Sequence, residues 1–159
     1  MPNEIENLEL IGLLDLEAHG NASANLITGN SGNNVIQGHG GADQLFGMGG
    51  EDAFYIDFEI GFTDTIMDFE TGKDLILLDA VSLGLFDQET LVGYSGVVQD
   101  QDYEVISSET DRTDKLFAFD TSNGILTLRT PSTLDLKEVL KIDLALSDEI
   151  LASDIYVLL

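Results

Sequence analysis

Side chains that carry oxygen recur at a fixed interval in the first third of the chain. Four of them stand nine residues apart, and each follows a glycine by five residues: Asn25, Asn34, Asp43 and Asp52, after Gly20, Gly29, Gly38 and Gly47. Amide and carboxylate oxygens, together with the backbone carbonyls of glycine-rich turns, are the ligands that a hard cation such as Ca²⁺ prefers. The spacing therefore predicts a row of oxygen-only cation sites.

The elements that position these oxygens follow from the same period. From Gly20 to Tyr55 the chain reads GNASANLIT, GNSGNNVIQ, GHGGADQLF and GMGGEDAFY. Nine residues divide into a glycine-rich turn and a short strand whose middle side chain points inward. If two repeats make one coil, Ile27 stacks on Leu45 and Ile36 stacks on Phe54. The pattern predicts a short parallel β-roll with a thin apolar core.

Stacking of this kind pairs turns that are two repeats apart. One expected cage joins residues 20–25 to residues 38–43, and the other joins 29–34 to 47–52. Each cage holds one repeat carboxylate, which predicts weak binding, with dissociation constants on the order of 10⁻⁴ to 10⁻³ M as in extracellular Ca²⁺ modules. A metal-free β-solenoid with Gly/Asn turns remains the alternative.

The repeat resembles the glycine- and aspartate-rich nonapeptide of RTX proteins, a Ca²⁺-binding signature. Further similar segments are IENLELIG upstream, DTIMDFETGKDLILL downstream, and LFAFDTSNGILTL and ASDIYVLL toward the C-terminus. The likeness is weak between Ala80 and Thr113. The sequence also departs from the GGxGxD turn, because His39 and Met48 stand at its second position and Asn25 and Asn34 replace aspartate.

The resemblance implies a set of calcium ligands made of side chains and backbone carbonyls: Asn25, Asn34, Gly38, Gly40, Ala42, Asp43, Gly47, Gly49, Glu51, Asp52, Asp64 and Asp68. Asp64 and Asp68 are four residues apart in DTIMDF and on one strand would face the same side. Related proteins use such a pair to complete the last sites, with the turns ending at Asp43 and Asp52 as partners. A solvated strand face is the alternative, and Asp57 and Glu70 are weaker candidates.

The composition favours a partner that is a cation. The chain has 30 acidic and 6 basic residues and a formal net charge of −24, which opposes compaction unless cations screen it. Nucleic acid and anionic membrane surfaces are therefore not expected partners. Cysteine is absent, so metal rather than a disulfide is the expected staple, and folding is expected to depend on metal.

No segment is long and apolar enough to insert directly into a membrane. The first residues, MPNEIENLELIGLL, place Glu4 and Glu6 where a secretory signal carries basic residues. In RTX proteins the export signal is an uncleaved C-terminal segment that a type I secretion channel reads, and ASDIYVLL resembles the end of such a segment. The resemblance thus implies a secreted, extracellular protein with the type I secretion machinery as a partner.

The sequence does not indicate an enzyme. His19 and His39 are the only histidines, they are expected to face solvent in turns, and neither has a serine, cysteine or second histidine in a nucleophilic arrangement. The HExxH, GxSxG and GxxxxGK[ST] motifs do not occur. The Gly38–Gly41 stretch lacks the helix that a dinucleotide site requires.

Downstream of the repeats, alternation of apolar residues predicts further strands. We expect a strand at 75–79, a hairpin of 116–119 with 125–128 around Gly124, and a polar surface loop at 99–113. Residues 139–146 suit a strand better than a helix, and a final strand at 154–159 follows a helical turn capped by Ser147 or Ser153. The expected fold is all-β, with a β-roll and lead-in strand at 1–56 and a β-rich C-terminal flank at 57–159.

The expected function is that of a calcium-binding RTX module of a secreted bacterial protein, which folds on Ca²⁺ after type I export and can follow an upstream catalytic or adhesive domain. The alternative is an accessory Ca²⁺-binding module of a polysaccharide-modifying enzyme, similar to the modules attached to alginate epimerases. Acidic sugars would need bridging Ca²⁺ or a basic patch, and the basic residues are scattered from Lys73 to Lys141.

Overall fold

The computed structural model describes residues 1–2, 4–57, 62–79, 96–97, 103–106, 117–120, 124–129, 136–142 and 150–158. Within these ranges all regular elements are β-strands, except for a 3₁₀ turn at Ala152–Asp154. The expected all-β class is confirmed.

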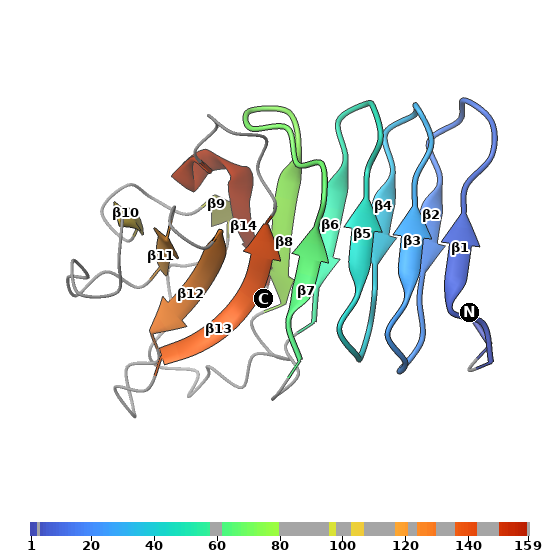
Figure 1. Ribbon diagram of the computed structural model, residues 1–159. Coiled ribbons are helices and arrows are strands. Elements are labelled where there is room, and N and C mark those ends of the chain that lie inside the picture. The colour runs from blue at the N-terminus through green and yellow to red at the C-terminus, as the bar shows by residue number, and fades with distance from the viewer. Residues whose placement is uncertain are drawn as a thin grey trace.

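Residues 7–57 and 62–79 form a β-roll of two parallel sheets (Figure 1). The chain passes alternately through one sheet and the other, so odd-numbered and even-numbered strands stack separately. The first stack contains β1 (Asn7–Glu9), β3 (Leu26–Thr28), β5 (Gln44–Phe46) and β7 (Asp64–Ile66); the second contains β2 (Glu17–His19), β4 (Val35–Gln37), β6 (Ala53–Ile56) and β8 (Leu75–Asp79).

The register of these strands follows the nine-residue repeat. β3 pairs with β5 so that Ile27 lies beside Leu45, and β4 pairs with β6 so that Ile36 lies beside Phe54. Both predicted contacts are confirmed. Because each strand is so short, its middle residue is the one that faces the interior, and the flanking residues face outward.

The core is a single apolar column between the two stacks. Its central members are fully buried: Ile27, Ile36, Leu45, Phe54, Ile66 and Ile76. Burying one such side chain contributes about 1.5–3 kcal/mol. A column of this width leaves the turns at the two edges of the roll, where the polar residues at the sixth position of each repeat are nevertheless buried.

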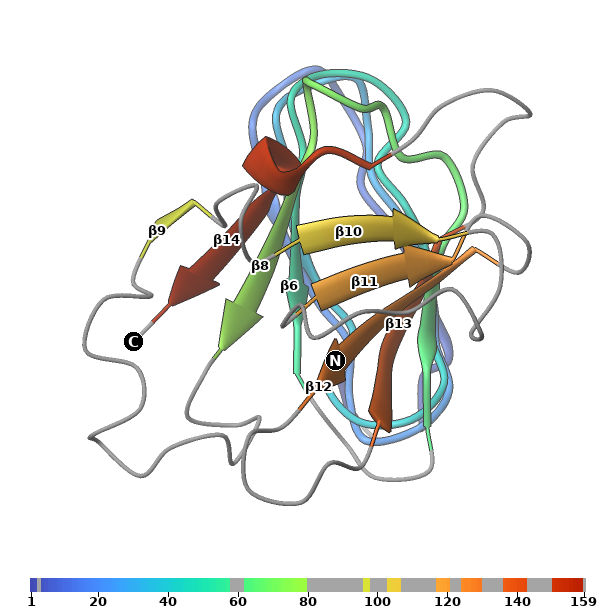
Figure 2. The same cartoon turned by 90° about the vertical axis from the view of Figure 1, so that its left-hand side faces the viewer.

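The C-terminal flank continues both sheets. β13 (Leu136–Ile142) pairs in parallel with β7, and β14 (Ile155–Leu158) pairs in parallel with β8. The expected boundary after residue 56 falls between β6 and β7, yet parallel stacking runs on through β7 and β8. Figure 2, which views the roll from its C-terminal side, shows the coils superimposed as a narrow loop behind β10–β13.

The expected hairpin is confirmed by β11 (Phe117–Asp120) and β12 (Ile125–Arg129), which are antiparallel. The expected loop at 99–113 is wrong in part, because β10 (Tyr103–Ile106) pairs with β11. Aliphatic Val105 and Ile106 in that polar segment were the available signal. A two-residue strand, β9 (Gly96–Val97), borders β14.

The last two predicted elements differ from the structure in their bounds. β13 is a strand, as favoured, but it begins at Leu136 and is described only to Ile142, so 143–146 lie outside the described residues. The final strand begins at Ile155. Ser153 lies within the 3₁₀ turn rather than before it, and the Asp154 carboxylate accepts the N–H of Leu151 at 2.9 Å. Ser147 lies outside the described residues.

Candidate metal centre

The turns of the roll gather along two edges. Edge one contains turns 20–25 and 38–43 and ends at Asp64; edge two contains turns 29–34, 47–52 and 67–74. Figure 1 shows edge one at the bottom of the roll and edge two at the top. This arrangement confirms that turns two repeats apart lie side by side, as the register of β3 with β5 and of β4 with β6 requires.

On edge one the sixth residue of each turn is joined to the next coil. The Asn25 N–H donates to Asp43 Oδ1 at 2.7 Å, and the Asp43 N–H donates to Asp64 Oδ1 at 3.1 Å. Asp43 and Asp64 are both buried. Asp64 is thus the counterpart of Asp43 one coil later, which agrees with its predicted partnership with that turn.

Edge two repeats this chain of contacts. The Asn34 N–H donates to Asp52 Oδ1 at 2.7 Å, and the Asp52 N–H donates to Asp74 Oδ1 at 3.0 Å. Asp74 is buried, and its second oxygen accepts the N–H of Glu70 at 2.8 Å. Sequence reasoning missed Asp74. The signal was there, because Gly72 and Asp74 precede β8 as Gly50 and Asp52 precede β6.

Asp68 also lies on edge two. Its two carboxylate oxygens accept the N–H groups of Gly47 and Met48 at 2.8 and 2.9 Å. Asp68 therefore lies beside the turn that ends at Asp52, with which it was expected to share a site. The prediction that Asp64 and Asp68 face the same side is wrong, because β7 ends at Ile66 and the two acids reach opposite edges.

Burial and mutual repulsion make these carboxylates hard to ionise. Burial, together with the charge of Asp43, raises the pKa of Asp64 to about 7. Burial, together with the charges of Asp74 and Asp68, raises the pKa of Asp52 to about 6. Burial also raises the pKa of Asp74. A bound cation favours the ionised form of each group and removes this penalty.

The glycines that open the turns keep space for converging oxygens. A Cβ placed on Gly38 would lie 2.0 Å from Asp43 Oδ2, and one on Gly47 would lie 2.4 Å from Asp52 Oδ2. A Cβ on Gly20 would lie 2.2 Å from the Gly38 carbonyl oxygen. Carboxylate and carbonyl oxygens around a space that only glycine leaves open match the donor set of a Ca²⁺ site.

The other predicted ligands lie in the aspartate-containing turns. Gly40 and Gly49 are half-buried, while Ala42 and Glu51 are exposed. In the part of the chain that the structure describes, no three His, Cys, Asp or Glu side chains gather closely enough to hold a metal by themselves. Backbone carbonyls must therefore complete any site on either edge.

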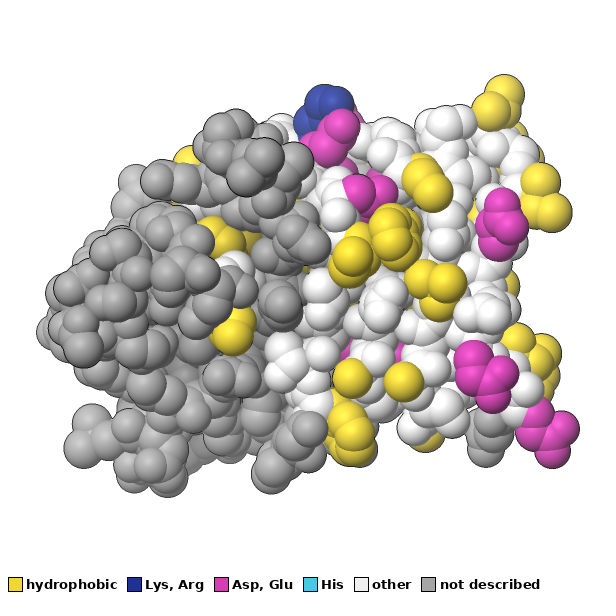
Figure 3. All heavy atoms as spheres, viewed as in Figure 1, with side chains coloured by type: hydrophobic (Ala, Val, Ile, Leu, Met, Phe, Trp, Pro, Cys, Tyr) yellow, Lys and Arg dark blue, Asp and Glu magenta, His cyan; other side chains and the backbone are white. Residues whose placement is uncertain are grey.

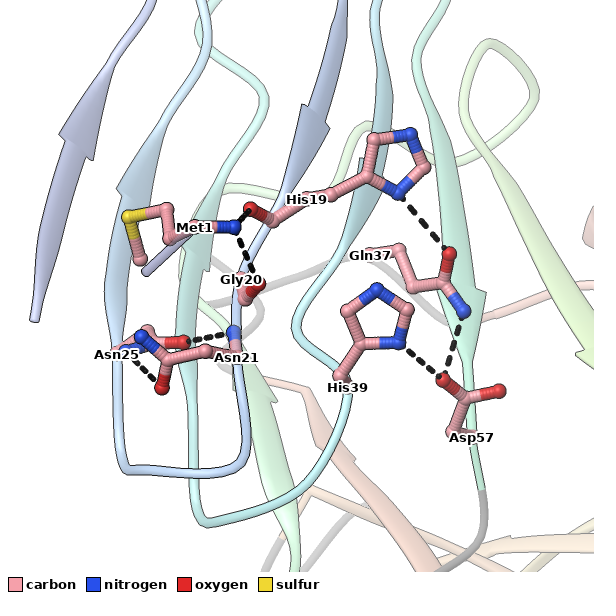
Figure 4. Close-up of polar contacts among 8 residues, drawn as sticks. All are labelled: Met1, His19, Gly20, Asn21, Asn25, Gln37, His39 and Asp57. Atoms are coloured by element: carbon pink, nitrogen blue, oxygen red, sulfur yellow. Dashed lines mark hydrogen bonds and ion pairs between the residues drawn. The ribbon is translucent and has the colours of Figure 1, made fainter. Parts of the chain in front are cut away.

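The two weaker candidates have other partners. Asp57 Oδ2 accepts Gln37 Nε2 at 2.7 Å and lies 3.2 Å from His39 Nδ1 (Figure 4). Glu70 forms an ion pair with exposed Lys73 and raises the pKa of that lysine. On the face of the molecule drawn in Figure 3, the described surface shows a basic side chain in one place, at the upper edge beside acidic side chains.

The histidines make no nucleophilic arrangement among the described residues. His19 is the last residue of β2 rather than a turn residue, and His39 lies in a turn; both side chains are more than two-fifths exposed. Their rings stack with centroids 5.8 Å apart. Glu17, Gln37 and Asp57 are the side chains that contact them.

Comparison with known families assigns the repeat region. A model of the RTX calcium-binding nonapeptide repeat matches residues 19–54 with four copies. A search of curated proteins found no match to the chain. No helix in the described ranges could span a bilayer. Residues 19–54 are RTX nonapeptide repeats, and repeats of this kind bind calcium.

Proposed function

We propose that this RTX repeat region is the calcium-dependent folding module of a secreted bacterial protein exported by a type I system. The observation that carries the proposal is the stacking of buried carboxylates, Asp43 with Asp64 on edge one and Asp52 with Asp74 on edge two. Buried acids on neighbouring coils destabilise a fold unless protons or cations neutralise them.

The proposed ligands divide between the two edges. On edge one they are Asp43 and Asp64 with the carbonyls of Gly38, Gly40 and Ala42. On edge two they are Asp52, Asp68 and Asp74 with the carbonyls of Gly47, Gly49 and Glu51. When bound, Ca²⁺ supplies positive charge that neutralises these carboxylates. The role of the residues is to hold their oxygens around the space that the glycines leave open.

The net charge of −24 gives this binding a consequence for folding. Self-repulsion favours an expanded chain where Ca²⁺ is scarce, and bound Ca²⁺ favours the roll because the unfolded chain has no formed site. A chain of this kind stays unfolded in the cytosol, passes a channel, and folds in millimolar Ca²⁺ outside. The module has a structural role, and no catalytic role is proposed.

Metal removal tests the first part of the proposal. Between chelator and 10 mM CaCl₂, each site with a dissociation constant of roughly 10⁻⁴ to 10⁻³ M should add about 1.4–2.7 kcal/mol to the free energy of unfolding. Circular dichroism at increasing temperature measures this difference, with MgCl₂ as the control for ionic strength. Equal thermal midpoints in chelator and in CaCl₂ would exclude calcium-coupled folding.

Export tests the second part. The signal is proposed in the last residues, which also form β14, where Ile155 and Val157 are buried. Deleting Ile155–Leu159 should abolish secretion through a matching type I channel. Val157→Ala damages the core but keeps the segment, so this variant should still be secreted. If the deletion variant is exported as well as the intact chain, the signal lies elsewhere.

A further inference from the structure

We infer that two of the four repeat turns hold no calcium and are closed by paired asparagine side chains instead. These asparagine turns are residues 20–25 and 29–34; the aspartate turns are residues 38–43 and 47–52. The inference rests on the proposed calcium binding and narrows it to the aspartate turns and the acids that follow them. It assigns Asn25 and Asn34 a structural role in place of the expected ligand role.

In the first asparagine turn, Asn21 and Asn25 bond to each other across the turn. The Asn21 N–H donates to Asn25 Oδ1 at 2.8 Å, and Asn25 Nδ2 donates to Asn21 Oδ1 at 3.3 Å (Figure 4). Asn21 Oδ1 also accepts the N–H of Ser23 at 2.8 Å. These contacts satisfy backbone N–H groups that face the inside of the turn.

The second asparagine turn repeats the arrangement on the opposite edge. The Asn30 N–H donates to Asn34 Oδ1 at 2.8 Å, Asn34 Nδ2 donates to Asn30 Oδ1 at 3.1 Å, and Asn30 Oδ1 accepts the Gly32 N–H at 2.7 Å. The two asparagine turns therefore close through the same hydrogen bonds although their neighbours differ. This closure depends on asparagine at both the second and the sixth position.

The remaining amide donors are also used. Asn21 Nδ2 donates to the carbonyls of Pro2 and Ile5 at 2.8 and 2.7 Å, and Asn30 Nδ2 donates to the carbonyl of Leu14 at 3.1 Å. All four amides are at least nine-tenths buried: Asn21, Asn25, Asn30 and Asn34. Satisfied buried amides of this kind stabilise a fold without an ion. An NH₂ group directed into the turn repels a cation.

The aspartate turns have a different backbone. Their second residues have left-handed φ angles, 66° at His39 and 73° at Met48, and their fourth residues, Gly41 and Gly50, have φ angles of 106° and 122°. Residues 20–34, all of which the structure describes, contain no positive φ. A histidine or methionine at the second position supplies no amide to cross the turn. One nine-residue period therefore contains two turn conformations.

The two kinds of turn also differ in charge, and this difference likewise favours calcium binding at the aspartate turns. The asparagine turns carry no carboxylate, whereas Ca²⁺ affinity rises with the number of charged ligands. Each is also joined to its aspartate neighbour by a direct hydrogen bond, from the Asn25 N–H to Asp43 and from the Asn34 N–H to Asp52. Each asparagine turn thus supports a neighbouring aspartate without itself needing the ion.

The test compares paired variants of the full chain in CaCl₂ titrations followed by circular dichroism. Asn25→Ala and Asn21→Ala both remove the bond between Asn25 Nδ2 and Asn21 Oδ1 and each removes further bonds of its own, but Asn25 alone is an expected ligand. The inference predicts the same calcium midpoint for both variants, within about twofold. A midpoint for Asn25→Ala at least about tenfold above that of Asn21→Ala would overturn it. Asn34→Ala and Asn30→Ala form the same test on edge two.

Two further measurements keep the outcomes distinct. If Asp43→Asn and Asp52→Asn leave the calcium midpoint unchanged, the proposed calcium sites are wrong. If these variants raise the midpoint and the midpoint of Asn25→Ala is also at least about tenfold above that of Asn21→Ala, only the present inference is wrong. In the unaltered chain with ¹⁵N-labelled asparagine, the Nδ2 protons of Asn25 and Asn34 should exchange slowly with solvent at saturating CaCl₂. Rapid exchange would contradict the inference without relying on any variant.

Discussion

The asparagine turns and the aspartate turns have the same length, precede the same kind of strand and cover the same apolar column, yet they close in different ways. In the first pair, crossed amide hydrogen bonds span the turn. In the second pair, buried carboxylates line up with those of the next coil. The difference teaches that strand spacing and the inward apolar residue define the coil. The residues at the second and sixth positions decide whether hydrogen bonds or a cation close the turn.

The largest contrast is expected from pH. The folded-state pKa values of Asp52 and Asp64, about 6 and 7, lie above the ordinary value of 3.8. Between these values the folded chain binds more protons than the unfolded chain, so without metal the free energy of unfolding should fall as pH rises from 5 to 8. Calcium requires ionised acids, so the stability that it adds should be lost as pH falls through 7 to 5.

Thermal midpoints in chelator and in CaCl₂ across this pH range check the prediction. The chelator curve should fall as pH rises, the CaCl₂ curve should be flatter, and the gap between them should widen with pH. Two curves that fall in parallel would show that calcium does not act on these acids. Asn25 and Asn34 do not titrate, so the asparagine turns should contribute nothing to either slope. In chelator, Asp74→Asn should lower the pKa of Asp52 by removing a neighbouring charge, so the chelator curve of this variant should fall less steeply.

The next effect concerns the glycines of an aspartate turn. Gly38→Ala would bring a Cβ within 2.0 Å of Asp43 Oδ2, whereas a Cβ on Gly49 meets nothing within 4 Å. Overpacking of this kind costs about 1–3 kcal/mol, and Gly38→Ala should also weaken calcium binding. Gly49→Ala should stay within about 0.5 kcal/mol of the parent protein. Denaturant unfolding in CaCl₂ measures both, and equal losses would argue against the proposed cavity.

A smaller effect is expected from two acids that each accept backbone N–H groups of edge two. Asp68 bonds to Gly47 and Met48 of an aspartate turn, whereas Asp15 bonds to Asn33 of an asparagine turn at 2.8 Å. Asp68→Asn should raise the calcium midpoint about tenfold, equivalent to about 1.4 kcal/mol. Asp15→Asn should leave the midpoint within about twofold. Similar shifts for both would remove the distinction between the turns.

The smallest effect should have opposite signs in the two kinds of turn. Met48 is exposed and has a φ of 73°, a conformation that costs an L-residue about 1 kcal/mol or more. Met48→Gly should therefore raise the thermal midpoint slightly. Asn30→Gly removes the bonds that the Asn30 side chain makes to Asn34, Gly32 and Leu14 and should lower it. If glycine has the same effect at both positions, the two turns do not differ as described.

Much of the roll could be predicted from the sequence because its period is local. The inward positions Ile27, Ile36, Leu45 and Phe54 and their partners follow directly from the repeat. The strand at Tyr103–Ile106 was not predicted, because two aliphatic residues, Val105 and Ile106, are a weak signal in a polar segment and the strand also depends on pairing with β11. The flank lacks a repeat, so its topology rests on contacts that a local pattern does not encode.

The site was predicted in outline but not in its pairings. Asp64 and Asp68 were identified, yet periodicity alone did not show where β7 ends. Because β7 ends between these two residues, they lie on opposite edges. Asp74 was missed because the nine-residue frame breaks after Tyr55. Asn25 and Asn34 carry the right oxygens for a cage, but only the positions of Asn21 and Asn30 reveal that amide bonds close these turns.

Hydrogen exchange of the folded chain, compared between a CaCl₂ concentration just above the folding midpoint and a saturating one, tests the central claim most directly. The claim is that calcium stabilises the aspartate turns and leaves the asparagine turns to their own hydrogen bonds. At pH 7.5, added CaCl₂ should slow exchange most at residues 43–46, 52–56 and 64–66, and least at residues 21–25 and 30–34. Equal slowing at all turns, or the largest slowing at the asparagine turns, would contradict the account.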